Sequence, residues 1–274
     1  MTEADRGTKS TEILIGDPER FKRLMEEFRI AGPSRIAAIV DYDGTISPLE
    51  MNSWDIPGLS NLDWPTIAGK LRRSAKIGEI SEDEFWLQSI SSLNEKGFGN
   101  SESTFEDVVV HLENACLLIR EGVHNLFQTC SQLGRFIIYS AGIKAVIEPH
   151  VAKISQIADI SESDIPSVVS NELDGSNLIT ISGKTGTTLL HELDKQGVNL
   201  NGISHFVLIG DSIGDARMSD GLQAEAVIKI GLLSTAKAVD PSIKASYIDT
   251  FDIVIVSDDS IEDANTLIEQ FFDS

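Results

Sequence analysis

Two aspartates stand two positions apart in the segment Asp41-Tyr42-Asp43-Gly44-Thr45, directly after the apolar run 35–40. If this loop stays extended, both carboxylates face the same way. Like charges that close repel each other, and this raises one pKa unless a cation lies between them. A hard divalent ion such as Mg²⁺ prefers oxygen ligands and keeps phosphate oxygens in its shell. The pair therefore predicts a metal site open to a phosphoester, with a plain turn after a strand as the alternative.

Polar or small residues also follow three later apolar runs: 135–139 before Ser140, 205–209 before Asp211, and 251–256 before Ser257. Each run is short and continuously apolar, as strands buried on both faces are, and a helix-like stretch follows it. This alternation predicts a parallel α/β sheet. Ligands of such sheets bind beyond the carboxyl ends of the strands, so we expect Asp41, Ser140 and Asp211 at one edge.

A long segment separates the first two predicted strands. Its last part, residues 117–133, predicts a core helix, whereas the part before it is rich in Ser, Glu, Leu and Trp and shows no strand signal. Loops longer than about 15 residues usually have structure or function of their own. We therefore predict a helical cap at 47–114, inserted into a core formed by 1–46 and 115–274.

Two smaller features complete the predicted organisation. Apolar residues at helical spacing in 11–31 predict an amphipathic helix, so that residues 1–31 form an N-terminal helical extension. Residues 166–182 predict a hairpin of two short strands around Asp174-Gly175.

Composition narrows the function classes. The 274 residues are 41% hydrophobic and 24% charged, as in a globular protein with a substantial core. A formal net charge of -21 argues against binding to nucleic acid or to an anionic membrane surface, because both require clustered Lys and Arg. With two cysteines and no apolar run typical of a signal peptide or membrane span, a cytoplasmic location is expected, while no oligomeric state is indicated.

Four short motifs, taken in order, resemble those of the haloacid dehalogenase (HAD) superfamily. The segment beginning at Asp41 is similar to the first motif, Ser140 to the second, Lys184 to the third, and Gly210-Asp211-Ser212-Ile213-Gly214-Asp215 to the fourth. The resemblance implies a Rossmann-like, three-layer α/β core with a parallel sheet and a helical, C1-type cap inserted after the first strand. A Walker A phosphate loop is rejected for the stretch around Lys184, because its glycines do not fit the required frame.

The resemblance also implies a reaction. Asp41 would attack phosphorus and form an aspartyl-phosphate that water then hydrolyses, which is covalent catalysis by a carboxylate. Asp43 would protonate the leaving oxygen and later deprotonate the water. A Mg²⁺ ion would bind the carboxylates of Asp41 and Asp211 and the backbone carbonyl of Asp43.

The remaining motif residues would hold the phosphate. The resemblance implies that Ser140, the Ala141 N–H and Lys184 bind the nonbridging oxygens, where charge gathers in the transition state. Asp215 would act from outside the metal's ligand set, orienting metal waters and Lys184.

Within the superfamily, the carboxyl-terminal third is similar to the cytosolic 5'-nucleotidase III (pyrimidine 5'-nucleotidase) family. The similar segments are 206–221, 227–233, 251–256 and 140–143. This implies a hydrolase of nucleotide metabolism whose substrate is a nucleoside 5'-monophosphate. Gly44 and the predicted cap depart from that family's usual pattern, which leaves another small phosphorylated metabolite, such as a sugar phosphate, as an alternative. The third hypothesis is a catalytically silent phosphate-binding regulatory protein.

Overall fold

The computed structural model describes residues 11–49, 53, 64–95, 119–174, 177–179, 181 and 183–272. Its strands are β1 (Glu12–Leu14), β2 (Ile36–Val40), β3 (Arg135–Ile143), β4 (Ser167–Asp174), β5 (Asn177–Ile179), β6 (His205–Gly210), β7 (Ala226–Leu233) and β8 (Ile253–Val256). Among the described residues, no helix is long and apolar enough to cross a membrane.

The α-helices are α1 (Pro18–Ala31), α3 (Trp64–Lys76), α4 (Glu82–Glu95), α6 (Val123–Cys130), α7 (Lys144–Ile157), α8 (Gly186–Lys195), α9 (Thr235–Ala238), α10 (Pro241–Thr250) and α11 (Glu262–Glu269). The described residues also contain the 3-10 helices η1 (Pro33–Arg35), η2 (Glu162–Asp164) and η3 (Ile213–Ser219).

All eight strands form one sheet in the order β1-β8-β7-β6-β2-β3-β4-β5. The pairs from β8 through to β4 are parallel, while β1 and β5 add to the two edges antiparallel. The strand β2 lies in the interior of the sheet between β6 and β3, so its carboxyl end is flanked by those of both neighbours. This confirms the predicted parallel α/β sheet and the hairpin of β4 and β5.

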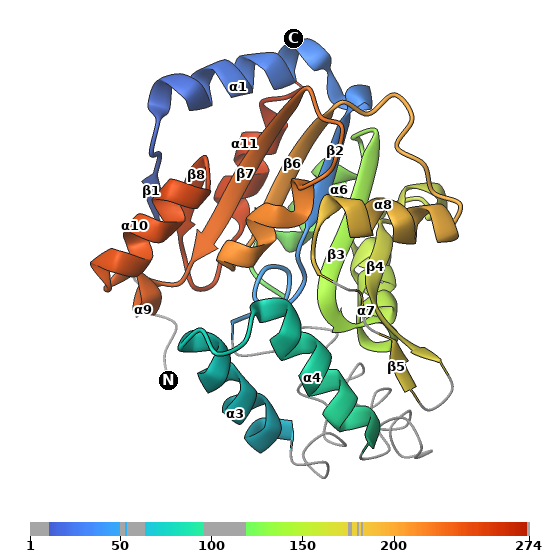
Figure 1. Ribbon diagram of the computed structural model, residues 1–274. Helices are drawn as coiled ribbons and strands as arrows, with labels where there is room; N and C mark the ends of the chain where they lie inside the picture. Colours follow the sequence, from blue (N-terminus) through green and yellow to red (C-terminus); the bar gives the residue numbers. More distant parts are fainter. Residues whose placement is uncertain are drawn as a thin grey trace, which may run out of the picture.

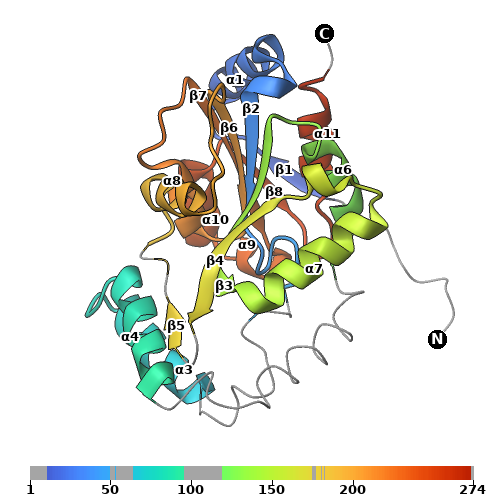
Figure 2. The same cartoon turned by 90° about the vertical axis from the view of Figure 1, so that its right-hand side faces the viewer.

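Helices cover both faces of the sheet, which gives three layers (Figures 1 and 2). All five residues of β2 are buried, and they alternate between two apolar clusters. Ala38 and Val40 face the cluster that includes α6, α7 and α11, whereas Ile39 faces the cluster that includes α8. Burial on both faces explains why β2 is continuously apolar in sequence.

The N-terminal prediction was partly wrong. The helix α1 starts only at Pro18, where the Asp17 side chain accepts a hydrogen bond from the Arg20 N–H at 2.9 Å. Residues Glu12–Leu14 form β1 instead, which pairs antiparallel with β8. The free edge of β8 offers backbone hydrogen bonds to this segment, and helical periodicity cannot register such a distant partner.

The helix predicted at 117–133 is also shorter than expected, since α6 starts at Val123. The residues just before it bond to other loops: the Arg120 N–H donates to the Ile46 carbonyl at 3.1 Å, and the Glu121 N–H donates to the Asp259 carbonyl at 2.8 Å. These donors tie the chain to the loops after β2 and β8 rather than to a helical turn.

The described part of the predicted cap is helical. The helices α3 and α4 pack against each other and lie beyond the carboxyl ends of the strands (Figure 1). Residues 96–118 lie outside the described part of the chain, so the cap boundaries at 47 and 114 remain predictions.

Candidate active site

Asp41 is the first residue after β2, and its carboxylate is held on both oxygens. Its N–H extends the sheet pairing by donating to the Ile209 carbonyl at 2.9 Å. The Thr45 hydroxyl donates to Oδ2 at 3.2 Å, and Lys184 Nζ forms an ion pair with Oδ1. The side chain is almost fully buried. Asp41 is thus a fixed carboxylate at the edge of the sheet where ligands of parallel α/β proteins bind.

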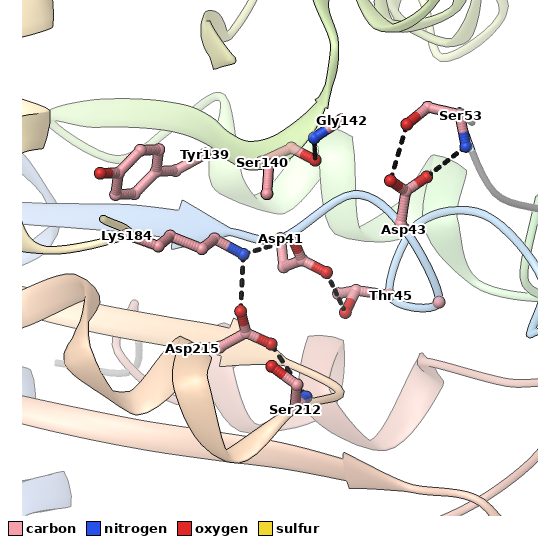
Figure 3. Close-up of polar contacts among 12 residues, drawn as sticks. Asp41, Asp43, Thr45, Ser53, Tyr139, Ser140, Gly142, Lys184, Ser212 and Asp215 are labelled. Carbon is pink, nitrogen blue, oxygen red and sulfur yellow. Dashed lines mark hydrogen bonds and ion pairs between the residues drawn. The ribbon is translucent and has the colours of Figure 1, made fainter. Parts of the chain in front are cut away.

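Lys184 reaches this carboxylate from the loop before α8. The Tyr139 hydroxyl, on β3, lies within hydrogen-bond distance of the carbonyls on both sides of the lysine, at 3.2 Å from Gly183 and 3.1 Å from Thr185. Lys184 Nζ also donates to Asp215 Oδ1 at 2.6 Å (Figure 3). One ammonium group therefore links the residue after β2 to η3, the 3-10 helix that follows β6.

Asp215 lies on η3, where it forms a reciprocal cap with Ser212. The Ser212 N–H donates to Asp215 Oδ2 at 2.9 Å, which leaves Oδ1 for the lysine. Asp211 precedes η3 at the end of β6, and carboxylate oxygens of Asp41, Asp211 and Asp215 all lie within 4.8 Å of one another. Three residues from two separate motifs thus meet as predicted.

Asp43 points away from this cluster, toward Ser53 (Figure 3). The Ser53 N–H donates to Asp43 Oδ1 at 2.6 Å and the Ser53 hydroxyl to Oδ2 at 2.7 Å. Burial raises the pKa of Asp43 to about 6, against the effect of these two hydrogen bonds, which lower it. A carboxyl group with such a pKa can carry a proton near neutral pH.

Burial is also the main cause of the raised pKa values of Asp41 and Asp211, and neighbouring carboxylates add to it. Burial raises the pKa of Asp41 well above its ordinary value, opposed by Lys184 and reinforced by Asp215. Burial and the nearby Asp215 carboxylate raise the pKa of Asp211 to about 6. Burial alone would lower the pKa of Lys184, but the carboxylates of Asp215 and Asp41 outweigh it and raise that pKa. The site therefore favours additional positive charge.

This donor set fits a hard divalent cation. Carboxylate oxygens are the ligands that Mg²⁺ prefers, and at most a few protein carboxylates usually hold it beside substrate oxygens. Asp215 is already bonded by Lys184 and by the Ser212 N–H. Asp41 is bonded as well, by Lys184 and Thr45, so all three carboxylates remain in the group that could hold a metal ion.

The predicted phosphate-binding residues of β3 lie next to Asp41 through the pairing of β2 with β3. Ser140 is buried, and its hydroxyl accepts a hydrogen bond from the Gly142 N–H at 3.0 Å. The Ala141 carbonyl accepts one from the Asn171 side chain at 2.6 Å. The register between β3 and β4 shifts between Tyr139 and Ile143, so the strand is irregular at this point.

Arg120 is a buried residue of the site that sequence reasoning missed. Its Nε and one terminal nitrogen donate to the Gly44 carbonyl at 3.0 and 2.7 Å, and the other terminal nitrogen donates to the Ser257 carbonyl at 3.3 Å. The side chain thereby fastens the loop after β2 to the loop after β8. A single arginine in a segment predicted as helix carries no motif, so no signal in the sequence identifies it.

Comparison with known proteins shows that most of the chain matches a known family. Residues 80–272, more than half of the chain, match the family described as Pyrimidine 5'-nucleotidase (UMPH-1). The chain belongs to the pyrimidine 5'-nucleotidase family. It is therefore a phosphoric monoester hydrolase of the 5'-nucleotidase type, as the motifs predicted.

Individual proteins that are similar to this pyrimidine 5'-nucleotidase family member also have names of 5'-nucleotidases. The chain is 27% identical to a 7-methylguanosine phosphate-specific 5'-nucleotidase of Drosophila melanogaster, over 92% of this chain and 85% of that one. It is 24% identical to the human protein of the same name, over 94% and 91%.

Solved structures support the fold. A crystal structure of cytosolic 5'-nucleotidase IIIB bound to cytidine aligns with a TM-score of 0.73 and 23% identity, over 94% of this chain and 93% of that one. A HAD family hydrolase from Salmonella enterica aligns with a TM-score of 0.56 and 14% identity, over 92% and 81%. These likenesses confirm the predicted HAD core.

Proposed function

We propose that this enzyme hydrolyses nucleoside 5'-monophosphates with Asp41 as the nucleophile. The observation that carries the proposal is the buried Asp41 carboxylate at the end of β2, ion-paired with Lys184 and grouped with Asp211 and Asp215, in a chain of a 5'-nucleotidase family. These four residues come from three motifs: Asp41 from the first, Lys184 from the third, and Asp211 and Asp215 from the fourth.

In the first step, an Asp41 oxygen forms a bond to phosphorus while the bond from phosphorus to the ribose 5'-oxygen breaks. Asp43 gives its proton to that leaving oxygen, so a neutral nucleoside departs. In the second step, water attacks phosphorus and gives a proton to Asp43. This releases inorganic phosphate and restores the Asp41 carboxylate.

The phosphate would be held by residues around this carboxylate. Ser140, the Ala141 N–H and Lys184 would bind nonbridging oxygens, while Asp215 keeps Lys184 in place through their 2.6 Å contact. Fixed donors of this kind stabilise charge that develops in the transition state.

Mg²⁺ is the proposed cofactor, with the carboxylates of Asp41 and Asp211 and the Asp43 carbonyl as its ligands. Bound there, it would neutralise phosphate charge and offset the cost of keeping the buried aspartates charged. Activity that survives complete chelation of divalent ions would contradict this assignment.

The substrate is tested with a panel of phosphomonoesters. The relatives' names direct it to 7-methylguanosine 5'-monophosphate and cytidine 5'-monophosphate, with other nucleotides, sugar phosphates and an aryl phosphate beside them. Hydrolysis of the aryl phosphate without any nucleotide would refute the proposed substrate class. An Asp41→Asn variant as active as the wild type would remove Asp41 as nucleophile.

A second candidate is a phosphatase of another small metabolite. The family match starts at residue 80, so the first part of the predicted cap, which should contribute to the choice of leaving group, lies outside it. Preference for a sugar phosphate in the same panel would support this candidate.

A further inference from the structure

We infer that Ser53 is the positioning residue for Asp43. Through this contact, the start of the predicted cap contributes to proton transfer at the leaving group. The inference rests on the proposed role of Asp43 as general acid. It starts from a contact in which one residue engages both oxygens of the same carboxylate, at 2.6 and 2.7 Å.

Ser53 lies in the chain between β2 and α3, whereas Asp43 lies in the loop after β2. Its side chain is buried, at 2% exposure. A carboxylate bonded at both oxygens cannot rotate freely about its last torsion, and hydrogen bonds to a charged group are stronger than those between neutral groups. The contact therefore fixes where the Asp43 oxygens lie.

Gly142 makes room for this contact from the other side. A Cβ atom at Gly142 would lie 2.2 Å from Ser53 Oγ and 2.9 Å from Asp43 Oδ2. Residues from the first-motif loop, the start of the predicted cap and the end of β3 thus lie close together, and Figure 3 shows all three. Such tight packing indicates a built arrangement rather than a surface hydrogen bond.

The two donors of Ser53 differ in a way that suits a group that first gives and then takes a proton. The backbone N–H can only donate, so it holds Oδ1 as an acceptor. A serine hydroxyl can donate or accept, so it can bond Oδ2 whether or not that oxygen carries the proton. Ser53 can therefore keep Asp43 in one orientation through both chemical steps.

The test separates proton donation from the rest of catalysis by the leaving group. The ribose 5'-alkoxide is a poor leaving group and needs the Asp43 proton, whereas p-nitrophenolate leaves without one. The quantity to measure is kcat/KM, which excludes the later hydrolysis of the aspartyl-phosphate. We compare wild type, Ser53→Ala and Asp43→Asn on a nucleoside monophosphate and on p-nitrophenyl phosphate.

General acid catalysis contributes about 10²- to 10⁴-fold, so we expect Ser53→Ala to lower kcat/KM for the nucleotide by about 10- to 100-fold. The value for p-nitrophenyl phosphate should change by less than about 3-fold. Asp43→Asn should show the same selectivity more strongly, and Ser53→Ala added to it should have no further effect, because both act through one group.

Ser155→Ala is the matched control. It removes a different buried hydroxyl, on α7, and should leave kcat/KM for both substrates unchanged. An equal fall on both substrates, no fall on the nucleotide, or additive effects in the double variant would overturn the inference. If the wild type cleaves no nucleotide, the proposed substrate fails, and Ser53 is then tested with glycerol phosphate, whose alkoxide also needs a proton.

Discussion

Replacing Gly44 by alanine tests whether the loop after β2 shapes the proposed metal site. Gly44 has a φ of +78°, in the left-handed region, and its carbonyl is the acceptor for Arg120. A Cβ atom built there would lie 2.8 Å from Asp211 Oδ2 and 2.9 Å from Asp211 Cγ. Both separations are below van der Waals contact, so either the loop or the Asp211 carboxylate must move.

The expected effect has two parts. The left-handed backbone costs about 1–2 kcal/mol for a residue with a Cβ, and this lowers the free energy of unfolding. Displacing Asp211 acts on the metal: disturbing groups that orient metal ligands usually costs about 10- to 100-fold in affinity. We therefore expect Gly44→Ala to raise the Mg²⁺ concentration for half-maximal activity by about 10- to 100-fold.

Gly32→Ala is a matched control. Gly32 has a φ of +74°, but a Cβ there would meet nothing within 4 Å. With a ψ of 158° its backbone is in a region that glycine alone adopts readily, so Gly32→Ala should lose about 1–3 kcal/mol of stability, measured by urea unfolding, and keep the wild-type Mg²⁺ dependence.

Two results would refute this reasoning. If Gly44→Ala kept the wild-type Mg²⁺ dependence, the approach to Asp211 would have no consequence for the metal. If Gly32→Ala shifted that dependence equally, the effect would come from lost stability rather than from contact with Asp211.

Three further predictions concern charge in the site. Lys184→Met should lower kcat by about 10²- to 10³-fold, as loss of one fixed donor does, and a change in KM alone in steady-state assays would contradict that role. Arg120→Met leaves two carbonyl oxygens without their arginine donor at about 1–3 kcal/mol each, so urea unfolding should show a loss of about 2–6 kcal/mol rather than less than 1. Because burial raises the pKa of Asp43 and Asp211 from 3.8 to about 6, the folded metal-free protein binds more protons than the unfolded chain between these values. Its stability should therefore fall as pH rises from about 4 to 7, and thermal shifts should show Mg²⁺ stabilising it more at pH 7.5 than at pH 5, while a metal-free stability that rises over this window would contradict the assignment.

The position of the polar residues at the strand ends could be predicted from sequence because it depends on local features. A buried parallel strand is a continuous apolar run, and the residue that follows it must lie at the carboxyl edge of the sheet. Asp41 and Asp211 were placed correctly by that rule alone. Ser140 was also placed at the edge, although β3 continues through it to Ile143. Lys184 required the family resemblance, since no strand end marks it.

Other elements depended on partners far away in the chain. The strand β1 forms because β8 has a free edge, and Arg120 becomes part of the site because two loops present carbonyl oxygens to it. Neither partner is visible in a local pattern. Similarly, the helix predicted to start at residue 117 starts only at Val123, because the residues just before it form backbone hydrogen bonds with the loops after β2 and β8.

Asp43 depends both on local sequence and on contacts with distant parts of the chain. Its spacing from Asp41 after a buried strand is a local pattern that predicts a metal site, and the family resemblance implies its role as the acid. The direction of its carboxylate could not be predicted, since Ser53 is ten positions away and Gly142 lies on another strand. The sequence, read with the family resemblance, predicted the motif residues of the candidate site but not Arg120. The packing of three distant segments decided how the Asp43 carboxylate is held, because its orientation depends on contacts that only the folded chain creates.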